Sequence, residues 1–280
     1  MSTPSDLDAD AGSLGLGDTF LTNRPAPSEA LHGRRLVIAL DDGAKVVVDL
    51  REPSAAVDSS GGSAVRPVHR YEVFQVAPDL FFLRREAITE GKTSRSALLD
   101  LRDGRALVVD STVAGTKTPG QPKVGQRFRH GALSGSRDTG RFERSRELVG
   151  RRIMWTYSPT DVYEHIYLNE DWYVWHCLAG EEFRLAEVDP CVMFKVRDDI
   201  HVLGFGERVL PIAAVMVLNL ATMQSYASML GEEEDGSLNA FSFGARGTAI
   251  SNSWFPEPYD PRTAALADAD HPGDPRELRH

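Results

Sequence analysis

The sequence predicts an all-β protein made of two tandem, related antiparallel β-barrels. Three observations carry this prediction: short β-branched runs around turn residues, no long segment with convincing helical periodicity, and an internal repeat. Closed barrels are favoured over open sheets because closure removes the unpaired strand edges through which sheets associate. The chain has 280 residues, which is enough for two domains that each bury a core.

The chain divides into two strand-rich blocks by composition. We expect residues 30–114 to form the N-terminal barrel and residues 149–250 the C-terminal barrel. Residues 1–29 and 251–280 are rich in polar residues and Pro and are expected to be disordered tails. Residues 115–148 contain more basic than acidic side chains and are expected to be a basic linker or irregular segment. A clamp over an anionic ligand or an acidic partner is the alternative for that segment.

Each block contains hairpin signals, in which two β-branched runs flank a turn. The hairpins are expected at residues 36–50, 73–83 and 97–110 in the first block and at residues 192–203 in the second. The blocks also match one another, at offsets of 117 to 120 positions. The matching pairs are Gly33 to Leu36 with Gly150 to Ile153, Phe74 to Leu80 with Phe194 to Ile200, and Leu98 to Leu101 with Val217 to Leu220. This order indicates a duplicated antiparallel meander.

Charge and cysteine content exclude several classes of protein. The formal net charge of −10 argues against a nucleic-acid binder, and the longest apolar stretch, residues 209–223, is shorter than the ~20 residues of a membrane span. The N-terminus lacks the basic and apolar regions of a secretory signal. Two cysteines, Cys177 and Cys191, are too few for a disulfide framework, so we expect a cytoplasmic protein. A small organic ligand is the expected partner, and a homodimer is left open.

Common cofactor and hydrolase motifs are missing from the sequence, which contains no Walker loop, GxGxxG after a strand, GxSxG, HExxH or paired CxxC. We therefore predict no cofactor. Two histidines with Glu182 or Asp189 offer a set of zinc ligands, but strand spacing provides no helix-type ligand signature. No metal site is predicted for the same reason.

Residues 155–177 concentrate aromatic side chains, two histidines and carboxylates on two adjacent strands. If Glu170 and Asp171 form a two-residue turn, His165 faces His176 across the strands. One face then holds five side chains, namely Tyr163, His165, Tyr167, Trp172 and His176. A three-residue turn at 169–171 instead places Glu164 opposite His176 and His165 opposite Trp175. We favour the first register because two-residue hairpins are commoner.

This stretch supplies the candidate catalytic residues. His176 is the expected base, with Tyr163 and His165 as acid or orienting groups, and Glu164 takes the orienting role in the second register. Substrate contacts are expected from Tyr157, Tyr167, Trp155, Trp172, Trp175, Glu207 and Arg208. The structural alternative is that the aromatic wall is only packing and that Glu207 and Arg208 form an ion pair at the barrel rim.

An ordered series of motifs runs through the second block. It comprises Gly150 to Arg152, Trp155 to Pro159, Tyr163 to Asn169 (YEHIYLN), Trp175 to Leu178 (WHCL) and Phe241 to Ala245. In this series the sequence resembles the MoaF family, whose members are encoded with bacterial molybdenum-cofactor biosynthesis genes. The resemblance implies a calycin-like, lipocalin-type barrel in each half, a fold shared with phenolic acid decarboxylases. It covers the second block well and the first block through the internal repeat.

The chain departs from the family pattern at two places. It has Glu182-Phe183-Arg184 where the resemblance implies Glu-Lys-Gly, and Phe205 to Arg208 (FGER) where it implies Trp-Arg-Glu-Lys. These departures indicate a divergent member with a changed pocket.

Three functions fit the sequence. The first is a small-molecule-binding double barrel that acts as a cofactor-independent acid/base enzyme, a lyase, isomerase or cyclase, on a largely apolar substrate in secondary metabolism. The second is a non-catalytic accessory or carrier protein associated with molybdenum cofactor (molybdopterin) biosynthesis. The third, an architectural interaction protein, leaves the polar and aromatic wall unexplained.

Overall fold

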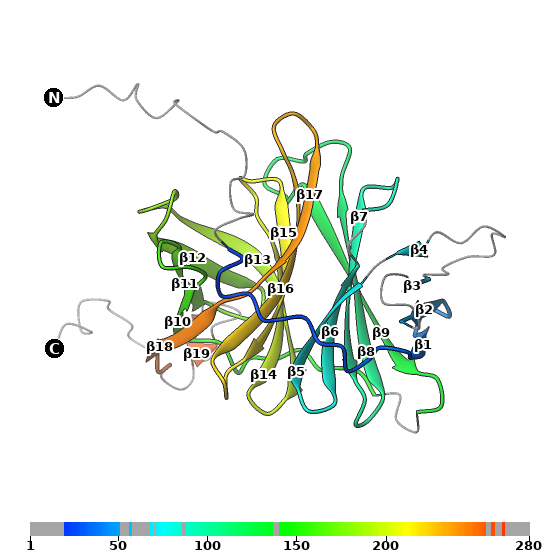
Figure 1. Cartoon of the computed structure of the whole chain (residues 1–280). Coiled ribbons are helices and arrows are strands. Elements are labelled where there is room, and N and C mark those ends of the chain that lie inside the picture. Colours follow the sequence, from blue (N-terminus) through cyan, green and yellow to red (C-terminus); the bar gives the residue numbers. More distant parts are fainter. Residues whose placement is uncertain are drawn as a thin grey trace, which may run out of the picture.

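The computed structural model describes residues 20–50, 71–85, 88–136 and 140–255, together with the backbone of four two-residue strands outside these ranges. These strands are β3 (Ala56–Val57), β4 (Val68–His69), β19 (Tyr259–Asp260) and β20 (Ala265–Leu266). Every regular element of the described residues is a strand, and the strands form two barrel-like units side by side, which confirms the predicted all-β class (Figure 1). Among the described residues, no helical segment has the length and hydropathy that a bilayer crossing needs.

The N-terminal unit is a curled sheet of seven strands that forms a half-barrel. Its strands are β1 (Arg35–Leu40), β2 (Lys45–Asp49), β5 (Tyr71–Ala77), β6 (Leu80–Arg85), β7 (Thr93–Asp100), β8 (Arg105–Val113) and β9 (Val124–Leu133). They are ordered β2-β1-β9-β8-β7-β6-β5, and all three predicted hairpins are present. Closure is predicted for this unit, but within the described residues β2 and β5 are edge strands, so the sheet stays open between them.

The C-terminal unit is a closed barrel. Its strands are β10 (Arg151–Thr156), β11 (Val162–Tyr167), β12 (Trp172–Ala179), β13 (Ala186–Arg197), β14 (Ile200–Gly206), β15 (Ile212–Asn219), β16 (Gln224–Glu232), β17 (Leu238–Phe243) and β18 (Arg246–Asn252). Strands β10 to β16 pair in chain order. The barrel closes because β18 pairs with β10 and, through Arg246, with Gln224 of β16.

The internal repeat is visible in the backbone as well as in the sequence. The β5–β6 and β13–β14 hairpins have the same irregularity of register, at Gln75/Ala77 and at Lys195/Arg197. Each also turns through an Asp with φ of 59°, Asp79 in the first unit and Asp199 in the second. A left-handed non-Gly residue is uncommon, so its recurrence at the same place in both hairpins supports duplication of one meander.

The two units pack through the outer wall of the barrel. Apolar side chains of β5 to β8 meet those of β13 to β16 in a single buried cluster that includes Phe82, Val109, Val202 and Val217. Polar contacts border this cluster, because Arg197 forms a two-point ion pair with Asp100 at 2.7 and 2.9 Å.

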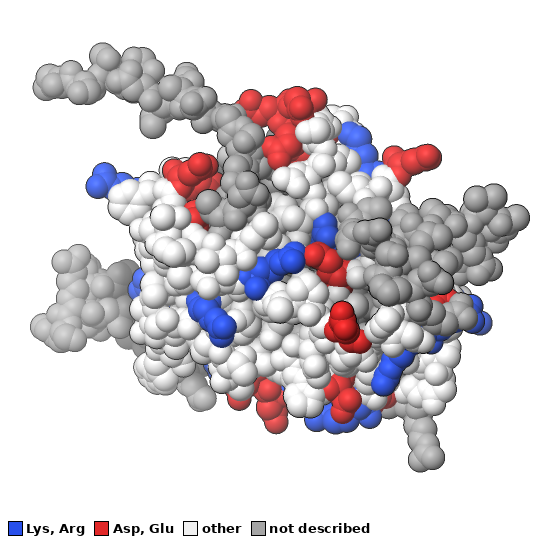
Figure 2. Space-filling model, in the orientation of Figure 1, with Lys and Arg blue, Asp and Glu red and all other residues white. Residues whose placement is uncertain are grey.

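The expected basic linker is largely structured. Residues 124–133 form β9, a central strand of the half-barrel, which the composition of residues 115–148 concealed. The basic side chains of this segment bind acidic partners in both units, as in the contacts of Arg127 with Asp42 and of Lys123 with Glu232. On the face shown in Figure 2, basic and acidic side chains are likewise interspersed.

The end of the expected N-terminal tail is also ordered. Residues 20–28, which we call the strap, run from the barrel to the half-barrel and are dark blue in Figure 1. Backbone hydrogen bonds tie the strap to both units, from Asn23 N to Tyr157 O and from Ser28 N to Val73 O. Residues 1–19 of that tail, and most of the C-terminal tail beyond residue 255, lie outside the described residues.

Candidate functional site

The register of the β11–β12 hairpin decides which side chains enter the barrel. Glu164 pairs with His176 and His165 with Trp175, so the three-residue turn forms and the register that we favour from sequence is wrong. The side chain of Asn169 explains the longer turn, because its Oδ1 accepts a hydrogen bond from the backbone N–H of Asp171 at 2.9 Å. A shift of one residue exchanges the two faces of a strand, so His176 moves to the opposite face from the prediction.

His176 and Glu164 lie on the outer wall of the barrel. The side chain of His176 is 40% exposed, and its Nδ1 is 3.6 Å from Glu164 Oε2. Glu164 is bound by the guanidinium of Arg152 at 2.7 and 3.0 Å, and this contact lowers its pKa. The expected general base therefore faces away from the lumen, in a surface polar cluster.

Two of the predicted substrate contacts also face outward. Trp172 is exposed, and the guanidinium of Arg208 lies 5.4 Å from the centroid of its ring. Arg208 and Glu207 do not pair as a rim ion pair. Arg208 lies 3.8 Å from Asp189 instead, while Glu207 is buried beside the lumen.

The remaining candidates point into the barrel, where they surround a small cavity that we call the lumen cavity. Trp155 and Tyr167 are completely buried in the surrounding core. The predicted residues in the cavity wall are Tyr157, Tyr163, His165, Trp175 and Glu207. The other wall residues are Phe20, Tyr173, Glu182, Phe205, Leu210, Ile212, Met229 and Phe243. The free space is about 40 Å³, enough for a few water molecules.

Phe20, from the strap, fills much of the lumen. Its ring stacks on Tyr157 with centroids 4.4 Å apart, and it also contacts Tyr163 and Phe243. Only 5% of Phe20 is exposed. A residue expected in a disordered tail is thus part of the cavity wall, and it limits the size of the cavity.

Two polar groups stand out among the aromatic side chains. The hydroxyl of Tyr163 donates a hydrogen bond of 2.9 Å to Glu182 Oε2, and burial raises the pKa of both groups. His165 is surrounded by Tyr167 and Tyr173, and burial lowers its pKa to about 3, so its imidazole is neutral. Its Nδ1 has no hydrogen-bond partner among the described residues. The cavity therefore offers a tyrosine–carboxyl pair and a neutral imidazole.

Three carboxylates meet beside this cavity, at the start of β13 and just after β14. One oxygen from each of Glu187, Asp189 and Glu207 lies within 4.8 Å of the others. Burial raises the pKa of Asp189 to about 6, with a further contribution from the charge of Glu187. Burial and the neighbouring acids also raise the pKa of Glu207. The sequence predicts no metal site, yet this set of oxygen atoms is of the kind that could hold a cation.

Sequence reasoning missed several residues of the cavity. Strand alternation assigns Tyr173 once the register is known, because it is two residues from Trp175 and its side chain lies on the same inward face. Glu182 lies outside any strand, in the loop between β12 and β13, so no alternation could assign it. Phe20 had no local signal at all, since a single aromatic residue in a polar segment does not reveal what it packs against.

Comparisons with known proteins identify the family. Residues 13–115 match the model of the MoaF N-terminal domain, and residues 142–253 match that of the MoaF C-terminal domain. Protein MoaF of Klebsiella aerogenes is 31% identical over 188 residues, which cover 60% of this chain and 69% of that protein. A solved structure, described as a putative β-lactamase from Burkholderia vietnamiensis, has a TM-score of 0.33 at 13% identity, and the match covers 39% of this chain and 100% of that structure. The chain belongs to the MoaF family.

Proposed function

We propose that the C-terminal barrel binds a small, largely apolar organic molecule in the lumen cavity and acts on it by acid/base chemistry, as a lyase, isomerase or cyclase. One observation carries the proposal: a tyrosine–carboxyl pair and a neutral imidazole face a small cavity whose other walls, apart from Glu207, are aromatic or aliphatic. Ligand sites typically combine such apolar walls with a few convergent polar groups whose pKa is shifted.

The chemistry falls to Tyr163, Glu182 and His165 in this proposal. Glu182 is positioned to take a proton through the hydroxyl of Tyr163, and its raised pKa brings it closer to neutral pH than a free carboxyl. In this relay the hydroxyl oxygen of Tyr163 accepts the proton from the ligand as its own proton passes to Glu182. The low pKa of His165 makes it a weak base, so we assign it an orienting role as a neutral hydrogen-bond partner.

Binding requires a change at the strap. A cavity of about 40 Å³ is too small for an organic molecule with several carbon atoms. Phe20 belongs to the strap rather than to a barrel strand, so its withdrawal enlarges the cavity without breaking the sheet. We therefore assign Phe20 the role of a stopper that the ligand displaces.

A non-catalytic carrier is the second candidate. It is favoured by the weak basicity of His165 and by the number of aromatic rings, which suit stacking with a planar ligand. The carrier and the enzyme share the site and differ in whether the bound molecule is converted.

The experiment compares two variants on opposite faces of β11 and β12. Purified protein is incubated with a panel of small aromatic and enolisable compounds, and binding and conversion are followed by NMR. We expect Tyr163→Phe to lower turnover by about 100-fold, the size of effect that general acid/base groups supply. The control, His176→Gln, changes the outer wall and should leave turnover within about twofold of the wild type.

Each outcome decides between the candidates. Binding without conversion by the wild type, weakened in Tyr163→Phe, supports the carrier. Ligand binding that is unchanged in Tyr163→Phe but lost in His176→Gln would place the site on the outer wall and overturn both candidates.

A further inference from the structure

The carboxylates of Glu187, Asp189 and Glu207 share the inward face of the barrel at its mouth. Glu187 pairs with Trp175 and Asp189 with Tyr173 across β12 and β13, and both partners face the lumen cavity. Glu207 follows the last residue of β14 and is itself in the cavity wall. The geometry of the strands thus brings the three acids together.

Two of the three carboxylates are buried, where repulsion between carboxylates is costly, and Glu187 is half-buried. Asp189 is 0% exposed and Glu207 7% exposed, and neighbouring carboxylates in such a place are strongly unfavourable without a counter-charge. Within the described ranges, the cluster makes one ion pair, between Asp189 Oδ1 and Arg208 Nε at 3.8 Å. The guanidinium of Arg208 also donates to Val188 O, so it is not dedicated to the carboxylates.

Unsatisfied oxygen atoms point to a ligand at this place. Glu207 Oε2 is buried and accepts no hydrogen bond from any described residue. The hydroxyl of Tyr173 is likewise buried and has no described partner, and it lies close enough to Glu207 and Asp189 for their charge to influence it. In contrast, Asp189 is held in place by Trp175 Nε1 and by the backbone N–H of Arg208, each at 3.1 Å. Such bonds orient a metal-binding carboxylate.

We propose that Glu187, Asp189 and Glu207 bind a hard divalent cation, Ca²⁺, Mn²⁺ or Mg²⁺, at the mouth of the C-terminal barrel. Oxygen donors without any histidine or cysteine select cations of this class over Zn²⁺. Oxygens up to 4.8 Å apart can share one ion, because Ca²⁺ ligands lie roughly 2.3–2.6 Å from the metal. The cation balances the carboxylates and fixes the start of β13 against the residue that follows β14. This inference does not depend on the proposed function.

The test uses the full chain after treatment with EDTA and dialysis. Isothermal titration calorimetry with CaCl₂, MnCl₂ and MgCl₂ should give saturable binding of one ion, and the same ions should raise the melting temperature. Glu207→Gln keeps the shape of the side chain but removes its charge, and it should weaken binding at least tenfold. Without added cation, this variant should melt at the same temperature as the wild type or higher, because one repelling charge is gone.

The matched control is Glu181→Gln, which removes an exposed carboxylate from the adjacent loop. It should leave the binding constant within twofold, which excludes general attraction of cations to an acidic chain. If Glu207→Gln fails to fold, Tb³⁺ luminescence of the wild type replaces it. Excitation of Trp175, whose indole contacts Asp189, should then sensitise Tb³⁺ emission that Ca²⁺ quenches by competition.

The proposal is overturned if the wild type shows no saturable response to any of the three cations, since protons alone then neutralise the cluster. It is also overturned if Glu181→Gln weakens binding as much as Glu207→Gln does.

Discussion

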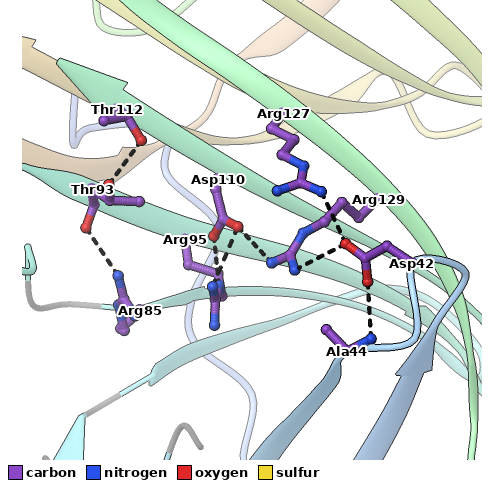
Figure 3. Close-up of polar contacts among 9 residues, drawn as sticks. All are labelled: Asp42, Ala44, Arg85, Thr93, Arg95, Asp110, Thr112, Arg127 and Arg129. Atoms are coloured by element: carbon purple, nitrogen blue, oxygen red, sulfur yellow. Dashed lines mark hydrogen bonds and ion pairs between the residues drawn. The ribbon is translucent and has the colours of Figure 1, made fainter. Parts of the chain in front are cut away.

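The two barrel-like units differ in whether their charged side chains have partners. In the half-barrel, Asp110 lies between the largely buried guanidinium groups of Arg95 and Arg129, and at the surface Asp42 binds the exposed Arg127 (Figure 3). In the closed barrel, Glu207 is buried with one oxygen unbonded among the described residues. Charges that are paired inside the protein stabilise it, whereas buried groups without partners remain available to a ligand. The carboxylate without a described partner is thus in the unit for which we propose ligand binding, the closed barrel.

The pairing in the half-barrel predicts the largest effect. Asp110→Ala leaves two largely buried guanidinium groups without their shared carboxylate, and it should lower the free energy of unfolding by about 4 kcal/mol. Urea denaturation measures the loss. The control is Asp198→Ala, which removes an almost fully exposed partner of Lys195 and should cost much less. Equal effects of the two substitutions would show that Asp110 is not specially important.

The closed barrel should respond to pH through His165. Burial lowers its pKa from 6.5 to about 3. Below pH 6.5, His165 therefore binds a proton in the unfolded chain but stays neutral in the folded chain until the pH approaches 3. Stability therefore falls as the pH falls from 6.5 toward 3. His165→Phe removes this dependence. The change that it causes in the free energy of unfolding should therefore be about 3 kcal/mol more favourable at pH 4 than at pH 7.

Urea denaturation at several pH values checks this prediction, with the exposed His32→Gln as the control. Parallel pH curves for His165→Phe and the wild type would mean that His165 is protonated as easily in the folded barrel as in the unfolded chain.

Turn chemistry made much of the fold predictable. The Asp-Asp-Gly sequence at 41–43 and the Asp-Gly pair at 103–104 mark tight turns, and both hairpins form there. The repeat also predicted the second unit, because a duplicated hairpin keeps even its left-handed Asp. Whether the N-terminal sheet closes was not predictable in the same way, since its two edge strands, β2 and β5, are not joined by a tight turn.

The site was harder to predict than the fold, for two physical reasons. One residue more in the turn at Asn169 exchanges the faces of β12 relative to β11, so a preference for short turns misplaced His176. The cavity is also completed by Phe20 and Glu182, whose positions depend on tertiary packing rather than on strand alternation. Tyr163 and His165 were identified because their inward orientation follows from the spacing that they share.

The role of the strap gives the most direct test of the lumen as a binding site. Phe20→Ala shortens the side chain that stacks on Tyr157 and should therefore enlarge the lumen cavity while the strands stay paired. Calorimetric titration with indole should show binding at least tenfold tighter to Phe20→Ala than to the wild type. Indole should also raise the melting temperature of the variant more than that of the wild type. If Phe20→Ala folds with its barrel intact and binds indole no better than the wild type, the lumen is packed core rather than a ligand site.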